Sequence, residues 1–135
     1  MKVIVCLDND NGMMFNNRRQ SRDANIIKDI LETSKDSNLL IAPYSESLFS
    51  GTDAVIQVSN TFLSEATHND YCFVENFHLL EYKDIITEIV VYKWNRDYPA
   101  DFFFDIDFSK NYRLISTSDF LGTSHDKITK EVYSV

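Results

Sequence analysis

The order of apolar runs along this chain restricts its fold more than any other feature. A continuous apolar run at residues 3–7 is followed by the polar stretch 8–12, which predicts a central strand that leads into a loop. From Asp23 onward, apolar residues recur at three- and four-residue spacing, which predicts an amphipathic helix capped by Ser21 or Asp23. A strand, a loop and a helix in this order are typical of an α/β domain.

Further apolar, β-branched runs predict more strands, separated by short helical segments. Strands are expected at residues 39–42, 54–58, 71–74 and 86–94, and short helices at 45–49, 60–66 and 79–85. The tail, residues 112–117 and 128–135, predicts two long antiparallel strands. The pattern therefore indicates a three-layer α/β fold whose mixed, mostly parallel sheet ends in a C-terminal antiparallel hairpin.

Length and composition predict that residues 1–135 form a single domain. Three glycines and two prolines are too few to build a flexible linker, and a hydrophobic content of 44% is enough for a core. The chain opens directly into its first strand, with no signal peptide and no apolar run long enough to span a membrane. We therefore expect a cytoplasmic protein.

The charge balance limits the partners that this chain is expected to have. The net charge is −8, and such an acidic protein repels a polyphosphate backbone, which excludes general nucleic-acid binding. A local basic patch is still able to bind a small anion. Cys6 and Cys72 lie in apolar stretches, where a thiol behaves as a small buried hydrophobic group rather than as a disulfide or a nucleophile.

Two stretches near opposite ends of the chain carry a recognisable pattern. At the start, the strand ending in Val5–Asp8 is followed by Gly12–Met14 and then by a helix beginning at Asp23. Near the end, Tyr92–Asp105 reads as a strand, an acidic connection and an Asp-x-x-Phe turn, and Tyr112–Ser116 continues into the closing hairpin. Both stretches resemble dihydrofolate reductases. The resemblance implies a dihydrofolate-reductase-like fold and places Asp23 within one position of the family's catalytic carboxylate.

The chain departs from that family wherever the nucleotide cofactor would bind. Ala42–Ser45 replaces a Gly-Arg-x-Thr motif, so the phosphate would meet a proline without an N–H instead of a guanidinium. Val74–Phe77 replaces a Gly-Gly pair, Tyr92 replaces a threonine, and Arg18–Arg19 stands near the place of a tryptophan. Residues 49–71 are too few for the usual nucleotide-binding unit. We therefore expect a domain that lacks the dinucleotide-binding elements and uses no cofactor.

The chain also resembles a group of short bacterial proteins of clostridial type. The shared stretches are Asn11–Asp23, Cys72–Asn76 and Lys93–Asp101, and members of the group are often labelled ribonuclease Z. That name implies a hydrolase whose clustered histidines hold two zinc ions. The histidines of this chain are His68, His78 and His125. Because they form no such cluster, the sequence does not support the label, and we expect no metal site.

The densest polar stretch, residues 16–23, holds the main candidate binding residues. Its arginines precede a helix N-terminus, and both features favour a planar anion. The alternative is a solvated loop, in which Asp23 only caps the helix and the arginines pair with carboxylates. Trp94 ends a strand at the edge where open α/β sheets place ligands, and the alternative is that it only packs against the closing hairpin. The predicted ligand-binding residues are Asn17, Arg18, Arg19, Arg22, Asp23, Glu75, Asn76 and Trp94.

These observations favour a non-catalytic binding or accessory protein over an enzyme. One alternative is an enzyme that acts on a pterin-like or other small anionic substrate without NADPH, with Asp23 as its candidate catalytic residue. Another is an interaction module that is a monomer or a homodimer. Residues 102–104 are expected to pack in the core and in a turn with one ring left to cover an edge, and the alternative is that they form a dimer interface. His125 is expected to belong to a turn, because its neighbours Ser124 and Asp126 cannot form a catalytic line with it.

Overall fold

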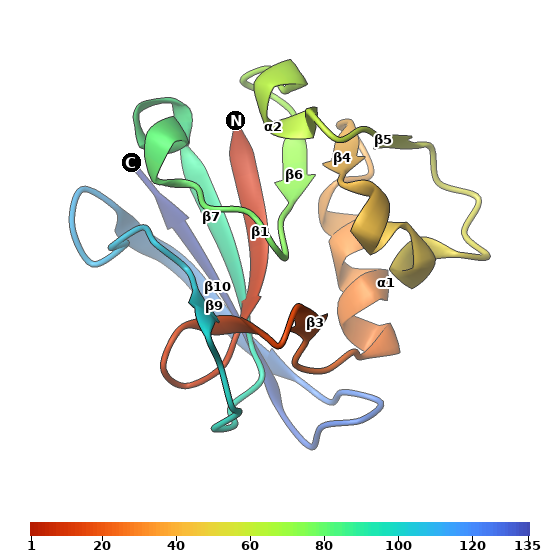
Figure 1. Ribbon diagram of the computed structural model, residues 1–135, viewed down its shortest axis with the longest axis vertical. Coiled ribbons are helices and arrows are strands. Elements are labelled where there is room, and N and C mark those ends of the chain that lie inside the picture. The colour runs from red at the N-terminus through yellow and green to blue at the C-terminus, as the bar shows by residue number, and fades with distance from the viewer.

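The protein is described by a computed structural model of residues 1–135, built around one seven-stranded sheet (Figure 1). The order across the sheet is β5-β4-β6-β1-β7-β10-β9. The β10 strand is antiparallel to both β7 and β9, and every other neighbouring pair is parallel. Its strands are β1 (Lys2–Leu7), β4 (Leu39–Ile41), β5 (Ile56–Val58), β6 (Tyr71–Phe73), β7 (Glu88–Lys93), β9 (Arg113–Phe120) and β10 (Ile128–Ser134). The predicted mixed α/β sheet with a closing hairpin is confirmed.

Strand β1 is the central strand of the seven, and it pairs in parallel with β6 on one side and β7 on the other. Val3, Val5 and Leu7 are buried in the hydrophobic core on one face, and Ile4 is buried in the core on the opposite face. Burial on both faces explains why the strand is a continuous apolar run rather than an alternating one.

One face of the sheet is covered by helix α1 (Ala24–Thr33) and the 3-10 helix η1 (Pro43–Phe49). Ile26 and Ile30 lie one turn apart and are almost fully buried against the sheet. Asp23 is the N-cap, since its carboxylate accepts a hydrogen bond from the second backbone N–H beyond it. The cap therefore sets where the helix begins, directly beside the edge of the sheet.

The other face is covered by shorter pieces of structure (Figure 1). These are α2 (Phe62–Glu65), the 3-10 helix η2 (Leu80–Ile85) and a small sheet of order β3-β2-β8, made of Arg18–Arg19, Gly12–Phe15 and Phe102–Phe103. The main sheet is thus sandwiched between two covering layers, as expected. No helix has the length and apolar character needed to cross a membrane.

The small sheet differs from the loop that the sequence predicted after residue 12. Strands β2 and β3 form a hairpin whose two turn residues, Asn16 and Asn17, have φ values of 51° and 61°. Asparagine tolerates this left-handed conformation, which suits a two-residue hairpin turn. Because β3 consists only of Arg18 and Arg19, no apolar pattern indicated a strand there.

Candidate functional site

A pocket lies at the carboxyl ends of β1, β6 and β7, beside the N-terminus of α1. Its lining residues are Cys6, Met13, Arg19, Gln20, Ser21, Arg22, Asp23, Ile26, Ile27, Leu48, Phe73, Val74, Glu75 and Trp94. The parallel strands all end at this edge, which is where open α/β sheets bind ligands. The free space at its centre is about 20 Å³, enough for about one water molecule.

Arg19 and Glu75 form a two-point ion pair in this pocket. Arginine Nε lies 2.8 Å from one carboxylate oxygen of Glu75, and Nη2 lies 3.0 Å from the other. The Ser45 hydroxyl also donates to this carboxylate, at 2.7 Å, and the Tyr44 ring stacks under the guanidinium. The hydrogen bond to Glu75 raises the pKa of Arg19 above its ordinary value. The charge of Glu75 is therefore neutralised within the protein.

The Asp23 carboxylate is fully enclosed by its own helix and by the loop between β9 and β10. One oxygen accepts from the backbone N–H of Asn25 at 2.9 Å and of Thr123 at 3.0 Å. The other accepts from the backbone N–H of Ser124 at 2.9 Å and from its hydroxyl at 3.1 Å. None of the Asp23 side chain is exposed to solvent. The carboxylate therefore fastens the start of the first helix to the last hairpin.

Hydrogen bonding keeps Asp23 ionised despite its burial. Burial raises the pKa of this carboxyl group, but the backbone donors of Thr123, Ser124 and Asn25 outweigh it and hold the pKa well below its usual range. Gly122 lets the loop approach so closely, since a Cβ at that position would lie 2.4 Å from an Asp23 oxygen. Only a glycine fits there without displacing the carboxylate.

His125 extends this arrangement, although the sequence predicted only a turn there. Its Nδ1 lies 3.4 Å from an Asp23 oxygen, and its Nε2 lies 2.8 Å from the Tyr98 hydroxyl. The imidazole ring packs against Trp94 with the ring centres 4.7 Å apart. No local pattern signals these contacts, because Asp23 is about a hundred positions away along the chain.

Asp8, which is buried, and Gln20, which is half-buried, are two further polar residues that sequence reasoning missed. Asp8 accepts from the backbone N–H of Gly12 at 2.7 Å and from the Gln20 side-chain amide at 2.7 Å. Gly12 is needed here, since a Cβ would lie 2.4 Å from Asp8 and 2.6 Å from Ala100. The Gln20 Oε1 atom is buried and has no hydrogen-bond partner. This oxygen can accept a hydrogen bond from a molecule in the pocket.

The pocket brings together five of the eight residues predicted to bind a ligand. Arg19, Arg22, Asp23, Glu75 and Trp94 all line it. The three others do not: Asn17 is an exposed turn residue, Asn76 is exposed, and Arg18 lines a neighbouring groove. Arg18 and Arg22 form no ion pair, whereas Arg19 does.

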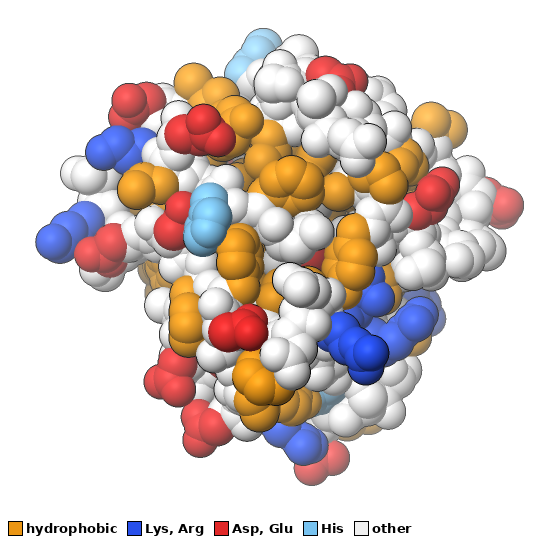
Figure 2. Space-filling model, viewed as in Figure 1, with side chains coloured by type: hydrophobic (Ala, Val, Ile, Leu, Met, Phe, Trp, Pro, Cys, Tyr) orange, Lys and Arg blue, Asp and Glu red, His pale blue; other side chains and the backbone are white.

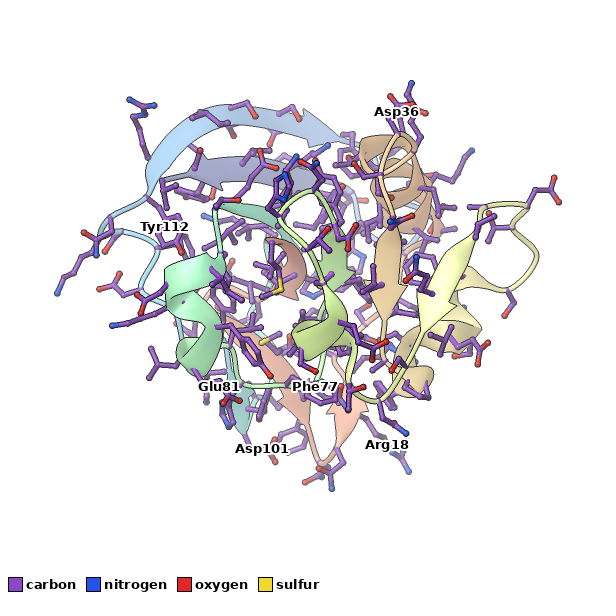
Figure 3. The ribbon with its side chains drawn as sticks, turned by 90° about the horizontal axis from the view of Figure 1, so that it is seen from above. Arg18, Asp36, Phe77, Glu81, Asp101 and Tyr112 are labelled. Atoms are coloured by element: carbon purple, nitrogen blue, oxygen red, sulfur yellow. The ribbon has the colours of Figure 1, made fainter.

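The neighbouring groove shares Arg19 and Gln20 with the pocket. Its lining residues are Phe15, Asn16, Arg18, Arg19, Gln20, Tyr98 and Pro99. Arg18 extends outward at the rim of the molecule, and basic side chains gather beside β3 (Figures 2 and 3). A positively charged rim therefore adjoins the pocket in a protein whose net charge is −8.

The two cysteines are free thiols. Burial raises the pKa of Cys6, which lines the pocket, and raises the pKa of Cys72 to about 12. Both thiols therefore stay protonated near neutral pH. No three His, Cys, Asp or Glu side chains come together in a geometry able to hold a metal ion.

No protein family model matches this chain, and no curated protein matches its sequence. Among solved structures, it is similar to a dihydrofolate reductase from Enterococcus faecalis complexed with NADP(H) and RAB-propyl, with a TM-score of 0.68. The match covers 98% of this chain and 94% of that one. The fold is that of a dihydrofolate reductase. Sequence identity is only 13%, so the likeness concerns the fold alone.

Two segments that depart from the dihydrofolate reductase pattern now have a place on this fold. Pro43 opens η1 directly after β4, so the chain turns there without a backbone N–H to offer. Glu75 follows β6 and is held by Arg19. Both segments therefore serve local packing and pairing.

Proposed function

We propose that this protein is a binding protein on a dihydrofolate reductase scaffold, which takes a small anionic ligand at the pocket beside α1 and uses no dinucleotide. The observation that carries this proposal is the unequal pairing of charges at the site. Arg22 lines the pocket and Arg18 lines the adjoining groove, and neither forms an ion pair. A guanidinium group without a carboxylate partner favours a carboxylate or phosphate ligand.

The carboxylates at the site do not oppose an anion. Asp23 is satisfied by the donors around it, and Glu75 is paired with Arg19. The net charge around the pocket is therefore positive, even though the whole chain has 21 acidic and only 13 basic residues. A small anion near Arg22 gains attraction there without meeting an unpaired negative charge.

The apolar part of the lining indicates that the ligand carries an apolar or planar group as well as its charge. Ile26, Leu48 and Phe73 line the pocket, together with Trp94 at the end of β7. Because the free space holds about one water molecule, a larger group enters only if the side chains that line the pocket move apart.

A dinucleotide is a poor fit to the same region. The end of β4 offers Pro43 where a phosphate would need a backbone N–H, and the end of β6 offers the Glu75 carboxylate. Placing a diphosphate near Glu75 would break its ion pair with Arg19 or leave two negative charges together. These features support binding without NADPH.

Thermal-shift and calorimetric measurements with a panel of small molecules test the proposal. The panel holds aromatic carboxylates, phosphorylated metabolites, folates, nucleotides and NADPH. A ligand present at one hundred times its dissociation constant should stabilise the protein by about 2.7 kcal/mol. Arg18→Ala combined with Arg22→Ala should abolish the effect, whereas Arg113→Ala, on the exposed strand β9, should leave it unchanged. Stabilisation by NADPH, or no response to any anion, would refute the proposal.

A homodimeric interaction module is the second candidate, and the exposed aromatic side chains of the small sheet favour it. Phe15 is 42% exposed and Phe103 is 45% exposed, and β2 and β8 that carry them are paired. Light scattering at increasing protein concentration tests this candidate. If the protein is a dimer, if Phe103→Ser makes it a monomer, and if no molecule of the ligand panel stabilises the protein, the interaction module would replace the first proposal.

A further inference from the structure

Tyr98, His125 and Asp23 form a line of hydrogen-bonded side chains at the edge of the pocket. The Tyr98 hydroxyl lies 2.8 Å from His125 Nε2, and Nδ1 of the same ring lies 3.4 Å from Asp23. The side chains of His125 and Asp23 are 2% and 0% exposed. A hydroxyl, an imidazole and a carboxylate in this order are the arrangement that activates nucleophiles in enzymes.

The surroundings of His125 determine which ring nitrogen carries the proton. The ionised Asp23 is only an acceptor, so the nitrogen facing it, Nδ1, holds the hydrogen and shares it with the Ser124 hydroxyl at 2.9 Å. Nε2 is then unprotonated and accepts the hydrogen of Tyr98. The imidazole is therefore placed to remove the proton of the phenol.

Two further contacts hold His125 in this orientation. Its ring packs on Trp94 at an interplanar angle of 30°, and the Tyr98 ring meets it nearly edge-on at 83°. The buried Asp23 carboxylate offsets the cost of placing a positive imidazolium in the interior. Asp23 thus acts as a positioning residue, which orients the base and stabilises its charged form.

We propose that Tyr98 is an activated phenol that exchanges a proton with a small anionic substrate held by Arg18. Tyr98 is half-buried and lines the groove in which Arg18 has no acidic partner. The hydroxyl is hydrogen-bonded to His125 Nε2, and the substrate is placed in the groove that Tyr98 lines. The identity of the substrate as an anion rests on the proposed function, whereas the activation of Tyr98 does not.

The proton transfer needs no further reactant. The phenol O–H bond breaks and an N–H bond forms at His125 Nε2, while an acidic hydrogen of the substrate moves to the Tyr98 oxygen. The bound substrate becomes its conjugate base, and His125 becomes an imidazolium beside Asp23. No atom is oxidised or reduced, and the reverse transfer restores the resting state.

Labelling by sulfonyl fluorides tests the activation without knowledge of the substrate. In that reaction the phenolate oxygen attacks sulfur, the S–O bond forms, the S–F bond breaks, and fluoride leaves while His125 keeps the proton. The probes are 4-(fluorosulfonyl)benzoate, which is anionic, and benzenesulfonyl fluoride, which is neutral. Peptide mapping then follows the labelling of all seven tyrosines.

The expected result is that Tyr98 reacts about 10-fold faster than any other tyrosine, a modest share of what a positioned base supplies in enzymes. His125→Gln should bring Tyr98 down to the rate of the others, with retention of the fold checked by near-ultraviolet circular dichroism. If that variant unfolds, the labelling rates of the seven tyrosines in the unaltered protein still show whether Tyr98 is activated. If Tyr98 is labelled no faster than the half-buried Tyr44, the proposal that Tyr98 is activated is overturned.

The anionic probe separates this inference from the proposed function. Tyr98 should prefer the anionic probe to the neutral one, and Arg18→Ala should remove that preference while Arg113→Ala keeps it. Fast labelling by both probes alike would keep the activated phenol but overturn the anionic substrate. Slow labelling together with anion binding in the ligand panel would overturn the activation and leave the binding function intact.

Discussion

Arg19 and Glu75 are joined by two parallel hydrogen bonds, of 2.8 Å and 3.0 Å, although they are 56 positions apart in the sequence. The pair decides the charge that the pocket presents to a ligand. While it is intact, Arg19 supplies little free positive charge and Glu75 little free negative charge.

Glu75→Gln should therefore strengthen the binding of an anionic ligand, because it releases the Arg19 guanidinium. The same change should lower the free energy of unfolding by about 2 kcal/mol, since one charge of a half-buried pair loses its partner. Calorimetry with the best anion of the panel and urea denaturation measure the two effects. Glu46→Gln, at an exposed position of η1, is the control. Weaker anion binding in Glu75→Gln would argue against an anionic ligand.

Asp23→Ala should destabilise the protein by about 3 kcal/mol. The change removes the helix N-cap, worth about 1 kcal/mol, and leaves the partly buried backbone N–H groups of Thr123 and Ser124 without their acceptors. Equilibrium urea denaturation gives the value. Asp53→Ala, at an exposed position after η1, should change stability very little. Equal losses in the two variants would contradict the role assigned to Asp23.

The pKa of Asp23 predicts how stability depends on pH. This pKa is lowered in the folded protein, so the unfolded chain binds a proton first, at its ordinary pKa of about 3.9. The stabilisation is therefore complete above that pH and is lost as the pH falls through it toward the lower, folded value. Denaturation curves at descending pH should show a shallower loss in Asp23→Ala than in the unaltered protein. Parallel curves would contradict the prediction.

Gly122→Ala should destabilise the protein by about 2 kcal/mol, the cost of forcing a methyl group into a filled site. The added Cβ would lie 2.4 Å from an Asp23 oxygen and 2.8 Å from the carbonyl oxygen of His125. Gly51→Asn is the matched control, because Gly51 has a φ of 81° in open space and asparagine tolerates that conformation. The melting temperatures of both variants give the comparison. A tolerated Gly122→Ala would mean that the loop does not enclose the carboxylate.

The main sheet could be predicted from the sequence because its central strands are buried on both faces. Residues 3–7 and 86–94 are long apolar runs, and they form β1 and β7 with only small differences at the ends. The small sheet could not be predicted in the same way. Its strand β3 has two residues, and the partner of β2 on its other side, β8, comes from a segment near residue 102.

The candidate site was predicted in part, for a related reason. The arginine-rich segment stood out because it is basic in an acidic chain, and Trp94 stood out because it is the only tryptophan and lies near the carboxyl end of a predicted strand. The pairing of Arg19 with Glu75 and the enclosure of Asp23 by residues 122–125 depend on tertiary contacts. His125 was assigned to a turn because its sequence neighbours were considered as partners, whereas the structure joins it to Tyr98 and Asp23 as well.

The enclosure of Asp23 also sets the order in which this molecule can be completed. The start of the first helix is fastened by N–H groups of residues 123 and 124, which the ribosome adds about a hundred residues later. Until residues 122–125 have emerged, the Asp23 carboxylate of a growing chain has only the local N–H of Asn25 as a donor. Because such distant contacts form slowly, the pocket should mature in one late step, after residues 122–125 have been added.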